Sequence, residues 1–251
     1  MFYLKYVHHS HSLTAGMDVT ANQEEISDHE TFQLEHEPRS GKWYLRTMQD
    51  RYFTLAPGGG IQAAEKKKTD QALFDLIWQE DGSVSFKAAN GNFRKSFTSL
   101  INCPLSTGKY IGNKKSGHLY ANCESLEANT KYYFYLINRP ILVLKCDQGF
   151  VGYKAAGSVK LECNKASYAT IQVERVEEGQ VHFKGQNGKY WHVTADGICC
   201  DSEVGQGFSL ELREPTKMCI KTSSGKYVVA GKNGSFSEGG SEVEAATRWE
   251  Y

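Results

Sequence analysis

The sequence predicts an all-β protein assembled from short hairpins that repeat along the chain. Three observations support this: apolar residues alternate with polar ones over short segments, glycine-containing turns separate these segments, and the same pattern recurs several times. Glycine is frequent, with 24 residues, and proline is rare, with 5, which is typical of a chain with many tight turns.

The clearest repeat covers residues 181–200. Residues 181–183 alternate between apolar and polar types, as in a half-buried strand. Asn187-Gly188 predicts a tight turn, because both residue types tolerate positive φ. Residues 190–193 form the expected second strand, and Asp196-Gly197 turns the chain into a third.

The same repeat recurs from Ile141 and from Met218. The aromatic residues Phe150, Tyr190 and Tyr227 occupy corresponding positions at a near-constant spacing. One such hairpin cannot bury its own apolar face, so neighbouring repeats must share a core. The first half of the chain repeats the pattern less regularly.

Each repeat ends with an alternating segment that predicts a fourth strand. These segments are residues 32–34, 74–76, 133–136, 171–173, 208–212 and 249–251. Four strands per repeat and three repeats per half describe a β-trefoil, in which three hairpins close a barrel and three cap it. We therefore predict two tandem β-trefoils, residues 1–138 and 139–251. We expect them to be packed together, because no Gly/Ser linker separates them around Pro140.

The third repeat contains an insertion. Asn90-Gly91 and Lys109-Tyr110 would together give the turn sequence of the other repeats, but residues 92–108 separate them. We predict a surface loop here. The segment is either a lineage-specific insertion or a sequence error such as unspliced coding, and it could also dock on the surface or bind a partner.

Composition argues against several classes of protein. Lys+Arg and Asp+Glu both number 29, so the net charge of zero does not favour a nucleic-acid partner. No apolar run reaches the roughly 18 residues of a membrane span, and we expect no membrane insertion. The N-terminal residues lack the pattern of a signal peptide. The seven cysteines contain no CxxC pair, which favours free, buried thiols in a reducing cytoplasm.

No catalytic or metal-binding motif is apparent, so we predict that the protein is not an enzyme and has no cofactor. The chain lacks a Gly-x-Ser-x-Gly elbow, a Walker loop and an HExxH pair. His8, His9 and His11 could chelate a metal, but we interpret them as a cluster at a strand end. A carbohydrate- or protein-binding trefoil remains the alternative, although the Gln-x-Trp of ricin-type lectins is absent.

Four strings in combination resemble fascin. They are GMDVTANQEE…ETFQLE at residues 16–35, INRPI at 137–141, NGKYW at 187–191 and RWEY at 248–251. The resemblance implies a monomeric, cytoplasmic protein of the actin cytoskeleton that binds and bundles actin filaments without catalysis. The chain resembles the third and fourth of fascin's four trefoils. Since fascin's actin-binding surfaces are spread over all four, we expect filament binding without crosslinking unless the chain dimerises.

The resemblance also suggests which residues contact actin. Filament surfaces are acidic, so exposed cations at hairpin tips and strand ends are the expected contacts. The matching positions are Lys114, Lys115, Arg139, Lys145, Asp147, Lys154, Lys217 and Lys221. Two positions depart from the family pattern, with Gln148 in place of a histidine and Ala155 in place of a basic residue. We expect reversal of Lys217 and Lys221 to glutamate to weaken filament binding and leave folding intact.

Other prominent residues have structural interpretations. Lys66-Lys67-Lys68 reads as a solvated charge run on a loop. We expect Tyr190, Trp191, Tyr227 and Trp249 to contribute to the core rather than to a stacking platform for bases.

Overall fold

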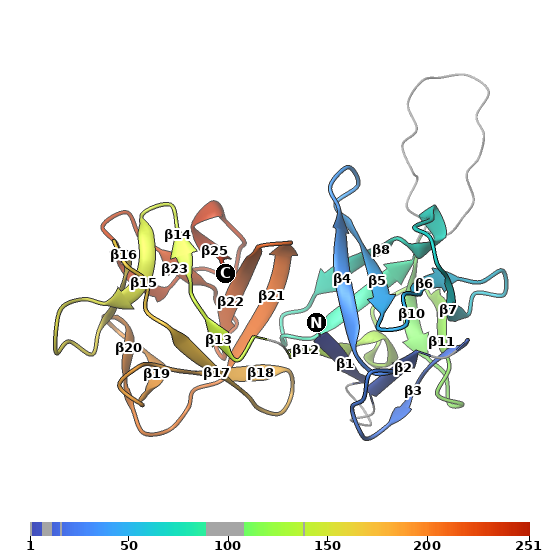
Figure 1. Ribbon diagram of the computed structural model, residues 1–251, viewed down its shortest axis with the longest axis horizontal. Helices are drawn as coiled ribbons and strands as arrows, with labels where there is room; N and C mark the ends of the chain where they lie inside the picture. The colour runs from blue at the N-terminus through green and yellow to red at the C-terminus, as the bar shows by residue number, and fades with distance from the viewer. Residues whose placement is uncertain (1, 7–11, 16, 89–107, 138) are drawn as a thin grey trace, which may run out of the picture. The chain divides into compact units, whose positions relative to one another are not determined.

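The computed structural model describes residues 2–6, 12–15, 17–88, 108–137 and 139–251 (Figure 1). The regular elements in these ranges are β-strands and three short 3-10 helices. The chain divides into two compact units. Unit 1 comprises residues 1–79 with 83–134, and unit 2 comprises residues 80–82 with 135–251.

Six strands form a closed barrel in unit 1. They are β1 (Phe2–Tyr6), β4 (Phe32–Glu37), β5 (Lys42–Thr47), β8 (Phe74–Trp78), β9 (Val84–Ala88) and β12 (Tyr132–Leu136). Each strand pairs with the next in this order, and β12 pairs with β1 to close the ring. Closure leaves no unpaired strand edge in the barrel.

Three further hairpins cap this barrel. They are β2 (Ser12–Ala15) with β3 (Val19–Gln23), β6 (Tyr52–Leu55) with β7 (Ile61–Glu65), and β10 (Lys109–Asn113) with β11 (Leu119–Cys123). Single β-bridges join each hairpin to the other two: Asp18 to Gln62, Thr20 to His118, and Gly60 to Tyr120. The cap is therefore a triangle of hairpins.

Unit 2 repeats this construction. Its barrel strands are β13 (Ile141–Leu142) followed by β14 (Lys145–Cys146), then β17 (Ile171–Arg175), β18 (Gln180–Lys184), β21 (Phe208–Glu214), β22 (Lys217–Thr222) and β25 (Arg248–Glu250). β13 pairs with β17, and the pairing continues through β18, β21 and β22 to β25. β25 pairs with β14 and closes the ring. The capping hairpins are β15 (Gly149–Tyr153) with β16 (Leu161–Lys165), β19 (Tyr190–Thr194) with β20 (Gly197–Ser202), and β23 (Val228–Ala230) with β24 (Phe236–Glu238).

These pairings confirm the prediction of two tandem β-trefoils with three four-strand repeats each. The six alternating segments expected as fourth strands are β4, β8, β12, β17, β21 and β25. The assignment of residues 1–138 and 139–251 to the third and fourth family trefoils stays a prediction. The predicted insertion lies outside the described residues except for Gly108, as do His8, His9 and His11.

Glycine is required at the turns that the sequence analysis identified. Gly188 has φ +75° and Gly197 has φ +125°, both in the left-handed region that disfavours side chains. A Cβ on Gly197 would also lie 2.8 Å from the carbonyl oxygen of Phe236. This glycine therefore lets the β19–β20 hairpin approach the third hairpin of the cap.

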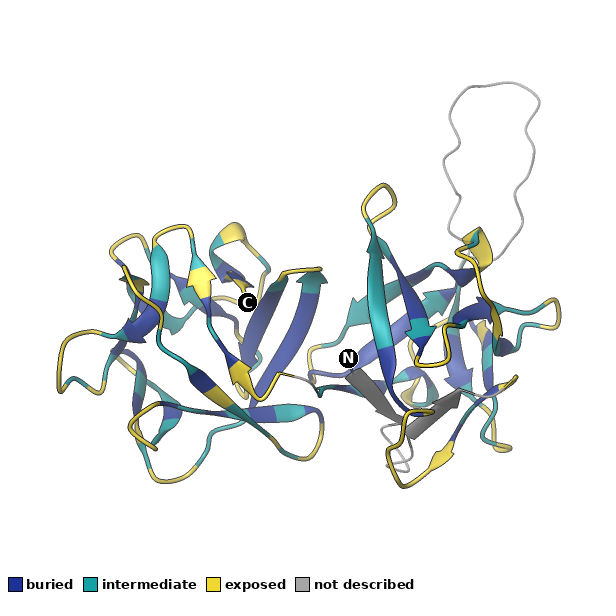
Figure 2. Ribbon diagram, in the orientation of Figure 1, coloured by how far each residue is buried: buried dark blue, intermediate teal, exposed yellow. Residues whose placement is uncertain are grey.

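The strands of each unit carry buried residues (Figure 2), and the largest of these side chains are mainly aromatic. In unit 2, Trp191 contacts Phe183 and Phe236 at ring-centroid distances of 4.9 and 5.3 Å. Phe236 in turn contacts Trp249 at 5.1 Å. In unit 1, Phe32 and Phe53 meet at 5.0 Å. Such ring–ring contacts, three of them edge-on, add to the stabilisation that area burial supplies.

The third repeats of the two units end in the same way. A 3-10 helix, η2 (Ala128–Thr130) in unit 1 and η3 (Ala245–Thr247) in unit 2, precedes the closing strand; the other short helix is η1 (Asp70–Ala72). Each closing strand buries one large ring whose polar atom donates to a hairpin carbonyl. Tyr132 donates to Ile111 at 3.3 Å, and Trp249 donates to Val228 at 3.1 Å.

Candidate functional site

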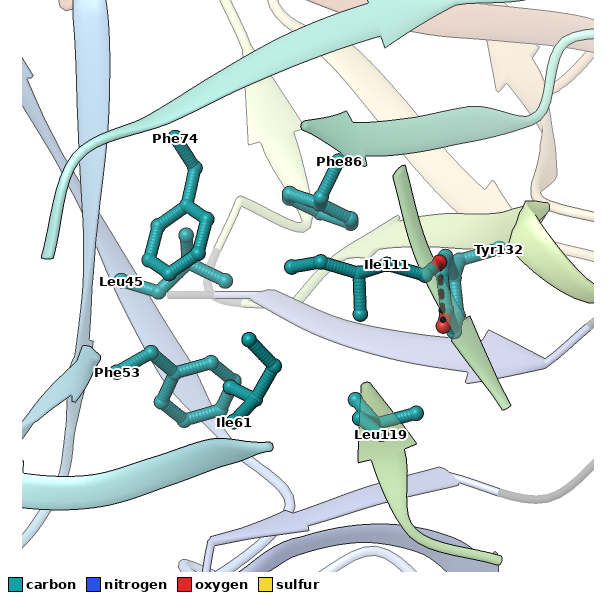
Figure 3. A pocket seen from close by; sticks show the side chains of 8 residues that line it. All are labelled: Leu45, Phe53, Ile61, Phe74, Phe86, Ile111, Leu119 and Tyr132. Carbon is teal, nitrogen blue, oxygen red and sulfur yellow. Dashed lines mark hydrogen bonds between the residues drawn. The ribbon is translucent and has the colours of Figure 1, made fainter. Parts of the chain in front are cut away.

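The space described in the core of unit 1 is too small for a ligand. A space of about 10 Å³ lies in unit 1 (Figure 3). It is lined by Leu45, Phe53, Ile61, Phe74, Phe86, Ile111, Leu119 and Tyr132. Space of this size holds no more than about one water molecule. The Tyr132 hydroxyl is already bonded to Ile111, so we interpret this space as a packing gap.

The described ranges contain no group of three or more His, Cys, Asp or Glu residues that could hold a metal ion. They also contain no helix that is long and apolar enough to cross a membrane.

A carboxylate, a cation and an aromatic ring meet at the same place in four repeats. In each, the cation lies on the first strand of the repeat, directly opposite the ring on the following strand, and forms an ion pair of 3.2–3.6 Å with the carboxylate. We call this arrangement the acid–cation–aromatic cluster. The four are Glu35–Arg46–Tyr52, Glu250–Lys145–Phe150, Glu174–Lys184–Tyr190 and Glu211–Lys221–Tyr227.

The cluster explains two of the predicted actin-binding residues. Lys145 and Lys221 each hold a cluster position, with their ammonium groups 5.9 Å and 5.1 Å from the ring centroids of Phe150 and Tyr227. Lys184 lies 5.1 Å from Tyr190 in the same way, although it was not predicted as a contact. A cation that recurs at this position connects its strand to the neighbouring strand that carries the carboxylate, so its presence alone does not indicate a filament contact.

The expectation that Lys221 is exposed is wrong. Its exposed fraction is 6%, and its ammonium lies 3.2 Å from Glu211, which is fully buried. All residues of β22 after Lys217 are buried, so this strand is covered on both faces. The outer face of β22 is therefore not free at Lys221. Reversal of Lys221 would therefore disturb folding.

The Glu211 cluster is a buried network. The Tyr227 hydroxyl donates to Glu211 at 2.7 Å, Arg213 forms an ion pair with the same carboxylate, and Arg213 also donates to the Tyr227 hydroxyl at 3.2 Å. Burial, followed by the hydrogen bond to Glu211, raises the pKa of Tyr227 well above its usual range.

Lys114 and Lys115 are exposed at the tip of the β10–β11 hairpin in unit 1. The Lys114 ammonium lies 3.3 Å from the centroid of the Tyr120 ring, which orients this side chain along the hairpin. A backbone bond from Lys114 to His118, of 3.0 Å, closes the turn. We call Lys114 and Lys115 the lysine turn.

Lys154 lies at the turn of a capping hairpin in unit 2, the β15–β16 hairpin of its first repeat. Its backbone N–H donates to Lys160 at 2.8 Å across the β15–β16 turn. Its ammonium is 3.9 Å from Glu162, so it is partly neutralised.

Asp147 is exposed on the β14–β15 turn, where the neighbouring Gln148 bonds to Gly231 and Gly234 at 2.7 and 3.0 Å. Gln148 therefore fastens this turn to the β23–β24 hairpin.

The structure brings Lys145 and Lys217 together across β25. Both residues lie directly opposite Glu250, one on each side, so the three side chains share a face. Lys217 and Arg248 both pair with Glu214, at 3.4 and 3.2 Å. The guanidinium of Arg139 lies 5.5 Å from the centroid of the Tyr251 ring. We call this set the strand patch: Arg139, Lys145, Lys217, Arg248, Glu214 and Glu250.

Sequence reasoning missed Arg248, Glu214 and Glu250. Arg248 and Glu250 belong to the RWEY string that helped to indicate the family, but their alignment with Lys145 and Lys217 depends on strand register. Three cations of the patch have a carboxylate partner: Lys145 pairs with Glu250, and Lys217 and Arg248 pair with Glu214. Exposed pairs of this kind contribute little to stability, which leaves them free to exchange partners.

The half-buried Tyr153 leads us to expect a loss of stability in alkali. Burial, followed by the nearby Cys200 thiol at 3.5 Å, raises the pKa of Tyr153 from 10.0 to about 12. A pKa raised in the folded state means that the contribution to stability is complete below pH 10 and is lost as the pH rises toward 12. We expect the urea midpoint to fall between pH 9 and 11. Tyr153→Phe should make the urea midpoint fall less over this pH range, whereas Tyr168→Phe, at an exposed position, should leave the fall unchanged. The same fall in the unmodified chain and in both variants would contradict the assignment.

Comparison with known proteins identifies one family. The fascin-domain model matches residues 7–104 and 153–251. Bovine fascin-2 is 31% identical over 241 residues, which cover 96% of this chain and 45% of the relative. Fascin from Strongylocentrotus purpuratus is 30% identical over 250 residues, covering 96% and 46%. The chain thus spans about half the length of the curated relatives that it matches.

A solved structure of hisactophilin also matches part of the chain. It is 23% identical with a TM-score of 0.39, and the match covers 54% of this chain and 97% of hisactophilin. The fold assignment rests instead on the strand pairing described above. Since the family model matches both halves of the sequence, the chain belongs to the fascin family.

Proposed function

We propose that this chain binds actin filaments as a non-catalytic protein, and that it crosslinks them where two filament-binding surfaces are available. The observation that carries this proposal is the match of the fascin-domain model in both halves of the chain. Filament bundling is the activity that the resemblance to fascin implies. The exposed cations supply the chemistry that an acidic filament surface requires.

The lysine turn is the contact that we favour most. Both of its lysines are exposed and, within the described residues, neither forms an ion pair with a carboxylate. Lys145, by contrast, is already paired with Glu250, and Lys217 with Glu214. Cations without a close counter-charge add more to long-range attraction toward an acidic partner than paired ones do.

Reversing both charges of the lysine turn should weaken filament binding. We expect Lys114→Glu with Lys115→Glu to raise the Kd for filamentous actin about tenfold, because two attractive contacts become repulsive. The measurement is co-sedimentation over a range of actin concentrations. Binding of the unmodified chain should also weaken as salt is added.

The matched control is Lys66→Glu with Lys67→Glu. These two lysines are adjacent and exposed in the same unit, so the change in net charge is identical. Their exchange should leave the Kd within about twofold of the original. An equal loss in both variants would mean that only net charge matters, and the lysine turn would no longer be a specific contact.

Sedimentation at two speeds separates binding from bundling. Pelleting with actin at high speed only would mean that the chain binds filaments through one surface. Pelleting at low speed as well would mean crosslinking, through a second surface or a second copy of the chain. Absence of the chain from both pellets, in a sample shown to be folded, would overturn the proposal.

A further inference from the structure

Two cysteines of unit 2 lie close together in the first repeat of that unit. Cys146 ends β14, and Cys163 lies in the middle of β16; both are free thiols. Cys146 is half-buried, whereas Cys163 is fully buried. The Cys146 thiol donates a hydrogen bond to the backbone carbonyl oxygen of Cys163, with 3.2 Å between the sulfur and the oxygen.

Gly149 makes this approach feasible. Cys146 and Gly149 lie directly opposite each other in the β14–β15 ladder, so their side-chain directions share a face. Gly149 has φ +142°, and a Cβ there would be only 2.7 Å from the carbonyl oxygen of Lys165. That face therefore lies against the backbone of β16.

The electrostatics of Cys163 agree with this placement. Burial raises the pKa of Cys163, and the neighbouring Cys146 thiol raises it further. The Cys163 thiol itself donates to the carbonyl oxygen of Ser235 at 3.3 Å, so it sits beneath the cap. The exposed fractions give the two thiols different access to solutes, because only Cys146 reaches the surface.

We propose that Cys146 and Cys163 form a reversible intramolecular disulfide when the protein meets a peroxide. The Cys146 thiolate attacks one oxygen of the peroxide, the O–O bond breaks, and the leaving hydroxide takes up a proton to form water. Cys146 is then a sulfenic acid. The Cys163 sulfur attacks the Cys146 sulfur, the S–S bond forms, and the second oxygen leaves as water. Two thiols thus lose two electrons and two protons, and one hydrogen peroxide becomes two waters.

Other described thiols are placed differently. Cys199 and Cys200 are adjacent in β20, and consecutive strand residues point to opposite faces. Accordingly, Cys199 lies near Thr194 at 3.9 Å, and Cys200 lies near Tyr153 at 3.5 Å. The buried Cys219 contacts Thr247 at 3.8 Å. These thiols have non-cysteine neighbours, so proximity favours the Cys146–Cys163 pair.

Thiol counting on the full chain tests the proposal. After treatment with equimolar hydrogen peroxide, removal of oxidant and denaturation, the protein should have lost two of its seven thiols, and dithiothreitol should restore both. Peptide mass mapping should find the peptide with Cys146 joined to the peptide with Cys163. Loss should be faster at pH 9 than at pH 7, because a thiolate, not a thiol, attacks the peroxide.

Two variants make the test specific. Cys146→Ser should retain its remaining thiols under the same treatment. Cys199→Ser is the matched control, since Cys199 is also half-buried on a strand of unit 2, and it should still lose two thiols. The proposal is overturned if Cys146→Ser loses two thiols, if the unmodified protein loses thiols without the Cys146–Cys163 crosslink, or if the crosslink joins two chains. Should Cys146→Ser fail to fold, the peptide map of the unmodified protein decides the matter.

Discussion

Replacing Lys221 with glutamate should destabilise unit 2 by about 3–5 kcal/mol, the usual cost of breaking a buried ion pair. The new carboxylate would face Glu211, which is fully buried and 3.2 Å from the present ammonium. Two carboxylates held so close away from water cannot both stay ionised without a large penalty. A loss of this size is a substantial part of the roughly 5–15 kcal/mol that keeps a domain folded. Urea unfolding followed by tryptophan fluorescence measures it.

The control for this substitution lies on the same strand. Lys217→Glu makes the same chemical change at a side chain that is 42% exposed and paired with Glu214 at 3.4 Å. We expect it to cost less than about 1 kcal/mol, because water screens the altered charges. A third variant, Lys221→Met, keeps most of the buried stem without adding a negative charge and should fall between the two. Equal losses for Lys217→Glu and Lys221→Glu would show that burial does not separate these lysines.

Truncation of Trp249 should have an effect of similar size. Trp249→Ala would remove a fully buried ring from contact with Phe236 and should cost about 3–5 kcal/mol. β25 joins β22 to β14, so this loss would also loosen the register that places Glu250 between Lys145 and Lys217. The measurement is the free energy of unfolding from urea titration.

Two further variants separate the contributions of the Trp249 ring. Trp249→Phe keeps an aromatic ring but removes the N–H that donates to Val228 at 3.1 Å, leaving a buried carbonyl without this bond. We expect it to cost about 1–3 kcal/mol. Tyr168→Ala removes a ring that is 63% exposed and should change stability by no more than about 0.5 kcal/mol. If Trp249→Ala proved as mild as Tyr168→Ala, closure of the barrel by β25 could not depend on this ring.

Local patterns were sufficient to predict the fold class. Alternation located the strands of each repeat, and turn pairs such as Asn187-Gly188 located the hairpins, because both signals depend on residues that are neighbours in the chain. The recurrence of the repeat then limited the ways in which the hairpins could share a core. The INRPI and RWEY strings carried the resemblance that the family comparison confirms.

The tertiary structure alone decided which charged residues are available to a partner. Lys217 and Lys221 look equivalent in the sequence, but one is exposed and the other is buried against Glu211. The alternation of apolar and polar residues indicates which side chains share a face of a strand. It does not indicate whether other parts of the chain cover the outer face. Likewise, the meeting of Lys145, Lys217 and Glu250, and of Cys146 with Cys163, depends on pairing between strands that are distant in the chain. Such register is set by closure of the whole barrel, to which a local sequence pattern contributes only one strand at a time.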